Sequence, residues 1–150
     1  MLYWEDFSVG QVFEGGPRPV TKEEIIAFAK RFDPQPFHID EEAASRSIYG
    51  GLIASGWHTI GMAMRMLVDA VMSRYAAIPA PGVDEARWKK PVRPGDTLFL
   101  RVEILELIPS RSKPDRGVVR SRVTLNNQKG EEVLTLMPVN LYRRRPAAKA

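Results

Sequence analysis

The feature that most constrains the fold is a change in the spacing of apolar residues along the chain. Apolar residues recur at helical spacing most clearly between Trp57 and Tyr75, whereas from Thr97 onward they alternate with polar residues. Helical spacing predicts helices, and strict alternation predicts half-buried strands. A first strand, a long buried helix and then an antiparallel meander predict an α+β fold in which the sheet wraps around a long central α-helix.

The longest predicted helix begins at Ser55 or Gly56 and runs from Trp57 to about Tyr75. It is apolar nearly all round, which predicts a buried helix, and charged residues interrupt it, so it is not a membrane span. Arg65 and Asp69 stand one turn apart and are expected to form an ion pair. The apolar stripe consists of Trp57, Ile60, Met64, Leu67 and Val71, and the methionines expected to fill the core are Met62, Met64, Met66 and Met72.

Two shorter helices are predicted before this long one. Thr21 and Glu24 form a capping box, and the helix that they start ends near Phe32. Asp40 can cap a second helix that runs from Glu41 to about Ser47. The segment 52–54 is expected to be a buried connector.

The second half of the chain predicts strands and tight turns. Ala80-Pro81-Gly82 is expected to end the helical part, Arg93-Pro94-Gly95-Asp96 has the Pro-Gly centre of a type II turn, and residues 126–130 predict a hairpin turn. A last strand is expected from Val133 to Tyr142. The residues predicted to face the core of the two preceding strands are Leu98, Leu100, Val102 and Ile104, and then Val119, Ser121, Val123 and Leu125.

Composition predicts one ordinary globular domain. The chain has 150 residues, 44% apolar and 27% charged, which suits a single domain over 1–150 with a flexible tail over 143–150. With no cysteine it has no thiolate nucleophile and no disulfide framework. The first residues lack a basic segment followed by an apolar one, so we expect a cytoplasmic protein.

The net charge of +4 and the isoelectric point near 9.6 raise the question of nucleic-acid binding. The basic residues are scattered among 18 acidic ones, and no recognition helix or RNA-binding motif accompanies them. We therefore expect a solvated basic surface and no nucleic-acid partner. A subset of the arginines and lysines remains suited to binding phosphate groups.

The segment Phe32-Asp33-Pro34-Gln35-Pro36-Phe37-His38 carries the only plausible acid/base pair, Asp33 and His38. Its two prolines fix their own φ angles and push the preceding residues toward extended conformations, so the helix cannot continue. A carboxylate and an imidazole at this spacing can converge on one water molecule, as proton transfer requires. The alternative is a plain Asp-Pro turn followed by a hydrogen-bonded surface histidine.

Three separated motifs resemble those of the MaoC-like dehydratases, also called type 2 enoyl-CoA hydratases, which have the hot-dog fold. The first motif has Asp33, Pro36, His38 and Asp40 in place, the second is the glycine-containing run 50–56, and the third is the run 91–98. The opening run 5–11 also looks like the first strand of that family. The chain departs from the family pattern at Phe32, Gln35 and Ser55, where a small residue, an asparagine and a histidine are usual.

The resemblance implies reversible hydration of trans-2-enoyl thioesters, or dehydration of 3-hydroxyacyl thioesters. Asp33 and His38 would share the water, and which of them takes the first proton stays open. The backbone N–H of Gly56, at the start of the long helix, is the candidate donor to the enolate oxygen. Gln35 and Ser55 are expected beside the pair in supporting roles.

The same reasoning assigns other residues structural roles and leaves some questions open. His58 and Asp40 are expected to be structural, and neither a cofactor nor a metal is predicted. The expected partners are an acyl-CoA or acyl-carrier-protein thioester and a second copy of the chain in a homodimer, with no membrane. A hot-dog thioesterase and a non-catalytic module that binds acyl thioesters remain the alternative functions.

Overall fold

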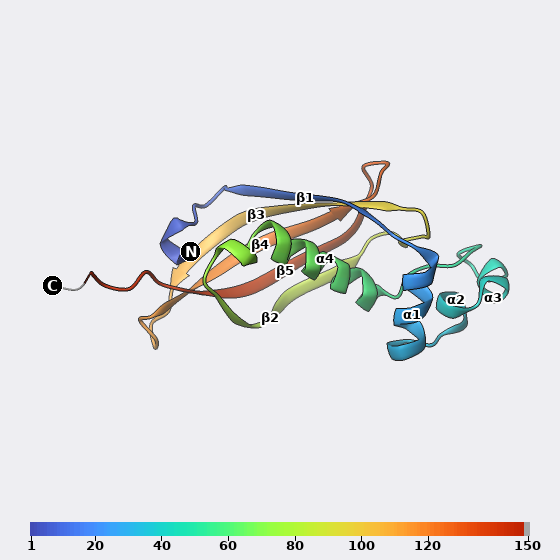
Figure 1. Cartoon of the computed structure of the whole chain (residues 1–150), viewed down its shortest axis with the longest axis horizontal. Helices are drawn as coiled ribbons and strands as arrows, with labels where there is room; N and C mark the ends of the chain where they lie inside the picture. Colours follow the sequence, from blue (N-terminus) through green and yellow to red (C-terminus); the bar gives the residue numbers. More distant parts are fainter. Residues whose placement is uncertain (149–150) are drawn as a thin grey trace.

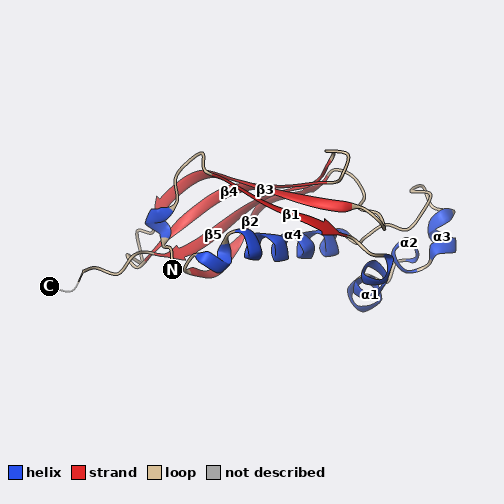
Figure 2. Cartoon of the chain, turned by 45° about the horizontal axis from the view of Figure 1, so that its top comes forward, coloured by secondary structure: helices blue, strands red, loops and turns tan. Residues whose placement is uncertain are grey.

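A five-stranded antiparallel sheet curves around one face of the longest helix, α4 (Gly56–Ala70), in the computed structural model, which describes residues 1–148 (Figures 1 and 2). The sheet order is β1-β3-β4-β5-β2, and every neighbouring pair is antiparallel. This confirms the predicted α+β architecture. The strands are β1 (Val12–Pro19), β2 (Ala77–Trp88), β3 (Thr97–Pro109), β4 (Arg116–Asn126) and β5 (Glu132–Arg143).

Three short helices lie together at the end of the molecule where α4 begins (Figure 1). They are α1 (Lys22–Phe32), α2 (Pro36–Ile39) and α3 (Glu41–Ser45). The capping box of Thr21 and Glu24 is present at the start of α1. The carboxylate of Asp40 accepts hydrogen bonds from two backbone N–H groups of α3, so both predicted helix starts are confirmed.

The alternation predicted for the central strands is also confirmed. The core-facing residues of β3 and β4 are at most 2% exposed, because they face α4 from the concave side of the sheet. Gly95 and Gly130 have φ angles of +87° and +74° in the two predicted turns. A positive φ is accessible to glycine without steric cost, and these turns join elements that must reverse direction.

The sequence prediction was wrong about β2. The run Ala80-Pro81-Gly82, expected to separate helix from sheet, lies inside this strand. Its pairing with β5 is irregular between Ile78 and Gly82, which accommodates a proline that has no N–H to donate. Because β2 is an edge strand with no buried face over most of its length, it lacks the alternating pattern by which strands are found.

The first strand begins later in the chain than the sequence predicted. Residues 4–6 form a short 3-10 turn, the carboxylate of Asp6 accepts a hydrogen bond from the N–H of Tyr3, and β1 begins only at Val12. β1 then pairs with β3, and its register shifts between Gly15 and Arg18. The motif at 5–11 therefore leads into the first strand rather than forming it.

The prediction for α4 was correct in place but wrong in its burial pattern. The helix ends at Ala70, and a separate 3-10 turn covers Met72–Arg74. Trp57 and Met64, expected in the buried stripe, are 64% and 45% exposed. The sheet of one chain covers only one face of the helix, so the opposite flank is left to solvent (Figure 2). The residues of α4 that are buried are His58, Thr59, Met62, Ala63, Met66 and Leu67.

The first residues of the chain and the end of β5 lie together at the end of the molecule opposite α1–α3 (Figure 1). Within the tail expected from residue 143 onward, Arg143 ends β5, and Arg144 and Arg145 form ion pairs with Glu5 and Asp6. Residues 149–150 of that tail lie outside the described part of the chain. The mobility of the tail stays a prediction.

Candidate active site

Asp33 is placed by the end of α1. Its N–H donates to the carbonyl of Ala29, its φ and ψ of −153° and 67° are not helical, and Pro34 follows. Since Pro34 disfavours a helical conformation at Asp33, α1 stops there and the carboxylate projects from the helix end.

His38 is placed by α2. The stiff turn predicted through this segment contains one helical turn, because Pro36 occupies the first position of α2, where a proline fits without loss of a hydrogen bond. The imidazole is 5% exposed, and its Nδ1 lies 2.7 Å from the carbonyl oxygen of Ile53. A carbonyl only accepts, so we assign the Nδ1 proton to this bond, which leaves Nε2 facing Asp33.

Asp33 and His38 meet as predicted. Oδ2 of Asp33 lies 3.3 Å from Nε2 of His38. When the imidazole is neutral, Nε2 is an acceptor, and a water molecule can donate to it or to the carboxylate. When the imidazole is charged, Nε2 donates directly to the carboxylate. The pair can therefore take up or release one proton without moving its heavy atoms.

Two side chains hydrogen-bond the Asp33 carboxylate. The hydroxyl of Ser55 donates to Oδ2 at 2.7 Å, and the amide of Gln35 donates to Oδ1 at 2.7 Å. Burial alone raises the pKa of Asp33, but these two hydrogen bonds and the nearby charge of His38 outweigh it and hold the pKa below its usual value. The carboxylate is thus ionised at neutral pH.

Gly56 is the first residue of α4. Ser55 directs its hydroxyl to Asp33 and does not cap the helix. Within residues 1–148 no backbone acceptor pairs with the Gly56 N–H, as expected for the first turn of a helix. The Gly56 carbonyl accepts from Nε1 of Trp88 at 2.8 Å, and a Cβ at this position would lie 2.5 Å from the indole ring. A side chain at this position would therefore displace Trp88 from its contact with the start of α4.

Asp33, His38 and Gly56 all line one cavity of about 480 Å³, which we call the Asp33 cavity. Sequence reasoning brought these three residues together correctly, but it missed Tyr49 and Trp88, which also line the cavity. Tyr49 comes from a loop, and Trp88 from the strand that the pattern did not reveal. The rim includes Lys89 and Lys90, part of a basic group visible in the sequence.

His58 and Asp40, which were expected to be structural, do not line the Asp33 cavity. His58 is 7% exposed and stacks on Phe28, with ring centroids 4.9 Å apart. Burial lowers the pKa of His58 below its usual value. The nearby charge of Glu24 opposes this effect and that of Arg18 adds to it, so the net shift is downward. Within residues 1–148 no group of three potential metal-binding side chains occurs, and no helix there is long and apolar enough to cross a membrane.

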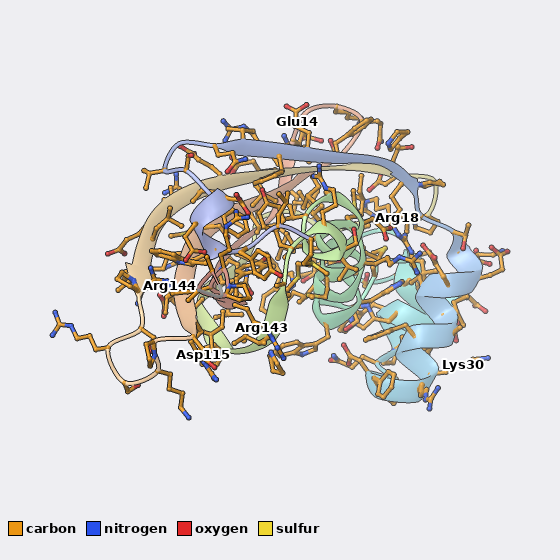
Figure 3. All side chains as sticks on the ribbon, turned by 60° about the vertical axis from the view of Figure 1, so that its left-hand side comes forward. Glu14, Arg18, Lys30, Asp115, Arg143 and Arg144 are labelled. Carbon is orange, nitrogen blue, oxygen red and sulfur yellow. The ribbon has the colours of Figure 1, made fainter. Side chains whose placement is uncertain are left out.

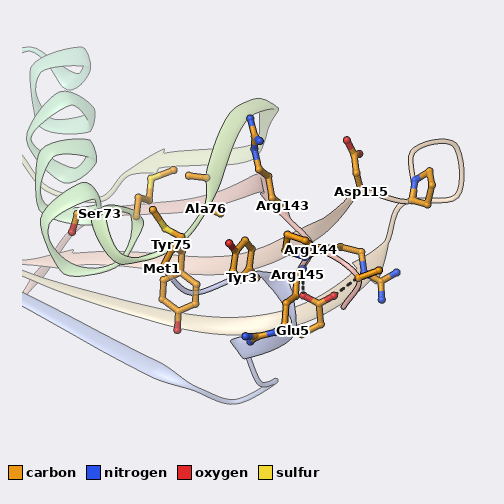
Figure 4. A pocket seen from close by; sticks show the side chains of 15 residues that line it. Met1, Tyr3, Glu5, Ser73, Tyr75, Ala76, Asp115, Arg143, Arg144 and Arg145 are labelled. Carbon is orange, nitrogen blue, oxygen red and sulfur yellow. Dashed lines mark hydrogen bonds and ion pairs between the residues drawn. The ribbon is translucent and has the colours of Figure 1, made fainter. Parts of the chain in front are cut away.

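A larger cavity, of about 980 Å³, lies at the opposite end of the molecule, between the first residues of the chain and the segment that follows β5 (Figure 4). Arg143, Arg144 and Asp115 gather at that end, far from Lys30 on α1 (Figure 3). Most of its charged groups are already paired, as Arg144 is with Glu5 (Figure 4). The described residues that line it include no histidine, so the Asp33 cavity is the better candidate for proton-transfer chemistry despite its smaller volume.

Comparison with known proteins agrees with the motifs and the fold. The family model described as "MaoC like domain" matches residues 6–127, which is most of the chain. The chain belongs to this MaoC-like dehydratase family, and its sheet wrapped around α4 is the hot-dog fold.

Individual relatives support the assignment. The Bacillus subtilis protein YdeM is 34% identical over 129 residues, covering 86% of this chain and 90% of that protein. The 3-hydroxybutyryl-CoA dehydratase of Methylorubrum extorquens is 32% identical over 139 residues, covering 89% and 79%. The crystal structure of the MaoC-like dehydratase from Rhodospirillum rubrum superposes with a TM-score of 0.90 at 43% identity, covering 98% and 100%.

Proposed function

We propose that this protein hydrates trans-2-enoyl thioesters reversibly, and so also dehydrates 3-hydroxyacyl thioesters. The observation that carries the proposal is the 3.3 Å contact between Asp33 and His38 on the wall of a cavity that Gly56 also lines. The relative from Methylorubrum extorquens is named as a dehydratase of one such thioester, which supports the same reaction class.

The proposed reaction needs a base, an acid and a stabiliser of negative charge. A water held between Asp33 and His38 loses one proton to the pair as its oxygen bonds to C3 of the enoyl group. The π electrons move onto the thioester carbonyl, whose oxygen accepts a hydrogen bond from the Gly56 N–H at the positive end of α4. The pair then returns a proton to C2, so water is added and the enzyme is unchanged.

Asp33 and His38 are not equally suited to accept and return the proton. The lowered pKa of Asp33 makes it a weak base, whereas Nε2 of His38, with Nδ1 held by Ile53, is free to accept from water when the ring is neutral. We propose that Asp33 orients the water and stabilises the imidazolium, and that His38 carries the proton. Ser55 and Gln35 hold the carboxylate in place.

The thioester carrier is proposed to lie at the rim beside Lys89 and Lys90. Ammonium groups bind phosphate through charge-assisted hydrogen bonds. Lys90 already pairs with Glu131, so Lys89 is the better candidate for a phosphate of coenzyme A or of an acyl carrier protein.

We further propose that two chains pair through β2. Residues 79–88 of this edge strand are all exposed, and the uncovered flank of α4 presents Trp57 and Met64. An unpaired edge beside exposed apolar side chains is the kind of surface that a two-fold partner covers. The single domain formed by one chain would then be half of a homodimer.

The direct test is an assay with crotonyl-CoA that follows the absorbance of the conjugated thioester together with the release of free thiol. Hydration removes the absorbance without releasing thiol, and this is the result we expect. Thiol release would instead identify a thioesterase. Binding of the thioester with neither signal would identify a non-catalytic module, and either result would overturn the proposal.

A further inference from the structure

A second cavity, of about 390 Å³, lies between α4 and the sheet, and we call it the helix–strand cavity. It follows the Asp33 cavity along one face of the helix, since Gly56 and Thr59 line the first cavity while Ile60, Ala63 and Leu67 line the second. Spacings of three and four residues place these side chains on the same helix face. Given the rise per residue of an α-helix, the stretch of α4 from Gly56 to Leu67 that lines the two cavities is roughly 16 Å long.

The walls of the helix–strand cavity are almost entirely apolar, with one exception, Asn140 on β5. Asn140 is 6% exposed and, at two-residue spacing, lies on the same face of β5 as Leu136 and Pro138, the face that points to α4. Among the described residues no side chain or backbone group hydrogen-bonds its amide, but the amide atoms are not fully enclosed, because the fully buried unpaired side-chain atoms are Nδ1 of His58 and Oδ1 of Asn126. The amide of Asn140 is therefore the one polar group that the cavity offers, and a ligand that displaces water from it must replace the hydrogen bonds of that water.

The residues that line the cavity limit the chemical class of ligand that it can bind. No charged side chain of the described residues lines it, so a carboxylate or an ammonium group would be buried without a counter-charge. An amide both donates and accepts, which suits an uncharged hydroxyl or carbonyl group. The apolar walls suit the methylene carbons that lead to that group.

We propose that Asn140 determines specificity for acyl chains that carry an uncharged polar group, a hydroxyl or a carbonyl, near their far end. This inference rests on the proposed function in so far as the thioester is taken to lie at Gly56. The acyl chain then runs along α4 from Thr59 to Leu67, and its distal oxygen hydrogen-bonds the Asn140 amide.

The test measures binding rather than turnover. Calorimetry compares butanoyl-, hexanoyl- and octanoyl-CoA, which are saturated and cannot be hydrated, with their ω-hydroxy counterparts. At the chain length that reaches Asn140, we expect the hydroxylated thioester to bind the wild-type protein about tenfold more tightly, because the plain chain leaves the amide unpaired. In Asn140→Leu we expect the preference to reverse in favour of the plain chain.

The control variant is Thr135→Val, which also replaces a polar side chain by an apolar one of similar shape on β5, but on the opposite face of the strand. We expect it to keep the wild-type preference. Equal affinities for the two series at every length, or the same preference in Asn140→Leu as in wild type, would overturn the inference. If the preference is found but crotonyl-CoA is not hydrated, the inference stands and the proposed reaction fails.

Discussion

At the scale of single residues, the site depends on how one carboxylate is held. Asp33 accepts from Ser55 and Gln35 and faces His38, so each of its oxygens has a fixed partner. Gln35 and Ser55, two of the residues at which the chain departs from the family pattern, are thus the residues that hydrogen-bond Asp33. They keep the carboxylate ionised and oriented, which the proposed water-holding role requires.

Removing either member of the pair is expected to stop turnover and leave the fold intact. We expect Asp33→Asn and His38→Ala each to lower kcat for crotonyl-CoA by at least about a hundredfold, since proton transfer loses its donor or acceptor. Steady-state kinetics and thermal unfolding of the purified variants measure the two effects. Near-normal turnover in either variant would contradict the mechanism.

Ser55→Ala tests the electrostatic role of the hydroxyl. Its hydrogen bond lowers the pKa of Asp33, so its loss raises that pKa, and the carboxylate is protonated at a higher pH. We therefore expect the acidic limb of the titration of the Asp33 carboxyl carbon, followed by NMR, to move to higher pH in this variant. Ser45→Ala, on the exposed surface of α3, is the matched control and should leave the limb in place.

At the scale of elements, the start of α4 connects the site to the sheet. Trp88 at the end of β2 lies over Gly56 and donates to its carbonyl, so the strand holds the first residue of α4 at the wall of the cavity. α1 and α2 supply Asp33 and His38, and Ile53 in the connector before α4 holds the imidazole. The site is the point where these elements meet.

Two glycines of α4 are expected to respond in opposite ways to replacement by alanine. A Cβ added to Gly61 would meet no neighbouring atom within 4 Å, so Gly61→Ala should raise the free energy of unfolding by about 0.5–1 kcal/mol. In Gly56→Ala the new methyl group would collide with Trp88 at 2.5 Å. We expect this variant to lose stability and activity, as denaturant unfolding and the crotonyl-CoA assay would show. Equal stability of the two variants would argue against the observed packing of Trp88.

At the scale of the whole molecule, one chain leaves its own helix partly uncovered. The sheet covers one face of α4, and the edge strand β2 and the exposed flank of the helix lie next to each other (Figures 1 and 2). The helix–strand cavity is lined from β2 as well as from α4, for example by Val83. A partner on β2 would therefore also close this cavity on its outer side.

A charge on β2 is expected to separate the proposed dimer. Val83 is 53% exposed, and a lysine there would place a charge in the strand interface, so Val83→Lys should shift the mass measured by light scattering toward one chain. Val12→Lys, on the other edge strand, is the control and should leave the dimer intact. A wild-type protein that is fully active as a monomer would exclude this assembly.

The sequence alone determined the features that depend on neighbours along the chain. The helix caps, the proline-bounded pair of Asp33 and His38, the alternation of β3 and β4, and the glycine turns are all local, so residue spacing was enough to find them. Tertiary structure alone decided the rest. β2 is a strand because β5 offers it hydrogen bonds, Trp88 covers Gly56 because that strand ends there, and Asn140 meets an apolar cavity because α4 crosses its face of the sheet. Such contacts join residues far apart in the chain, and no local pattern encodes them.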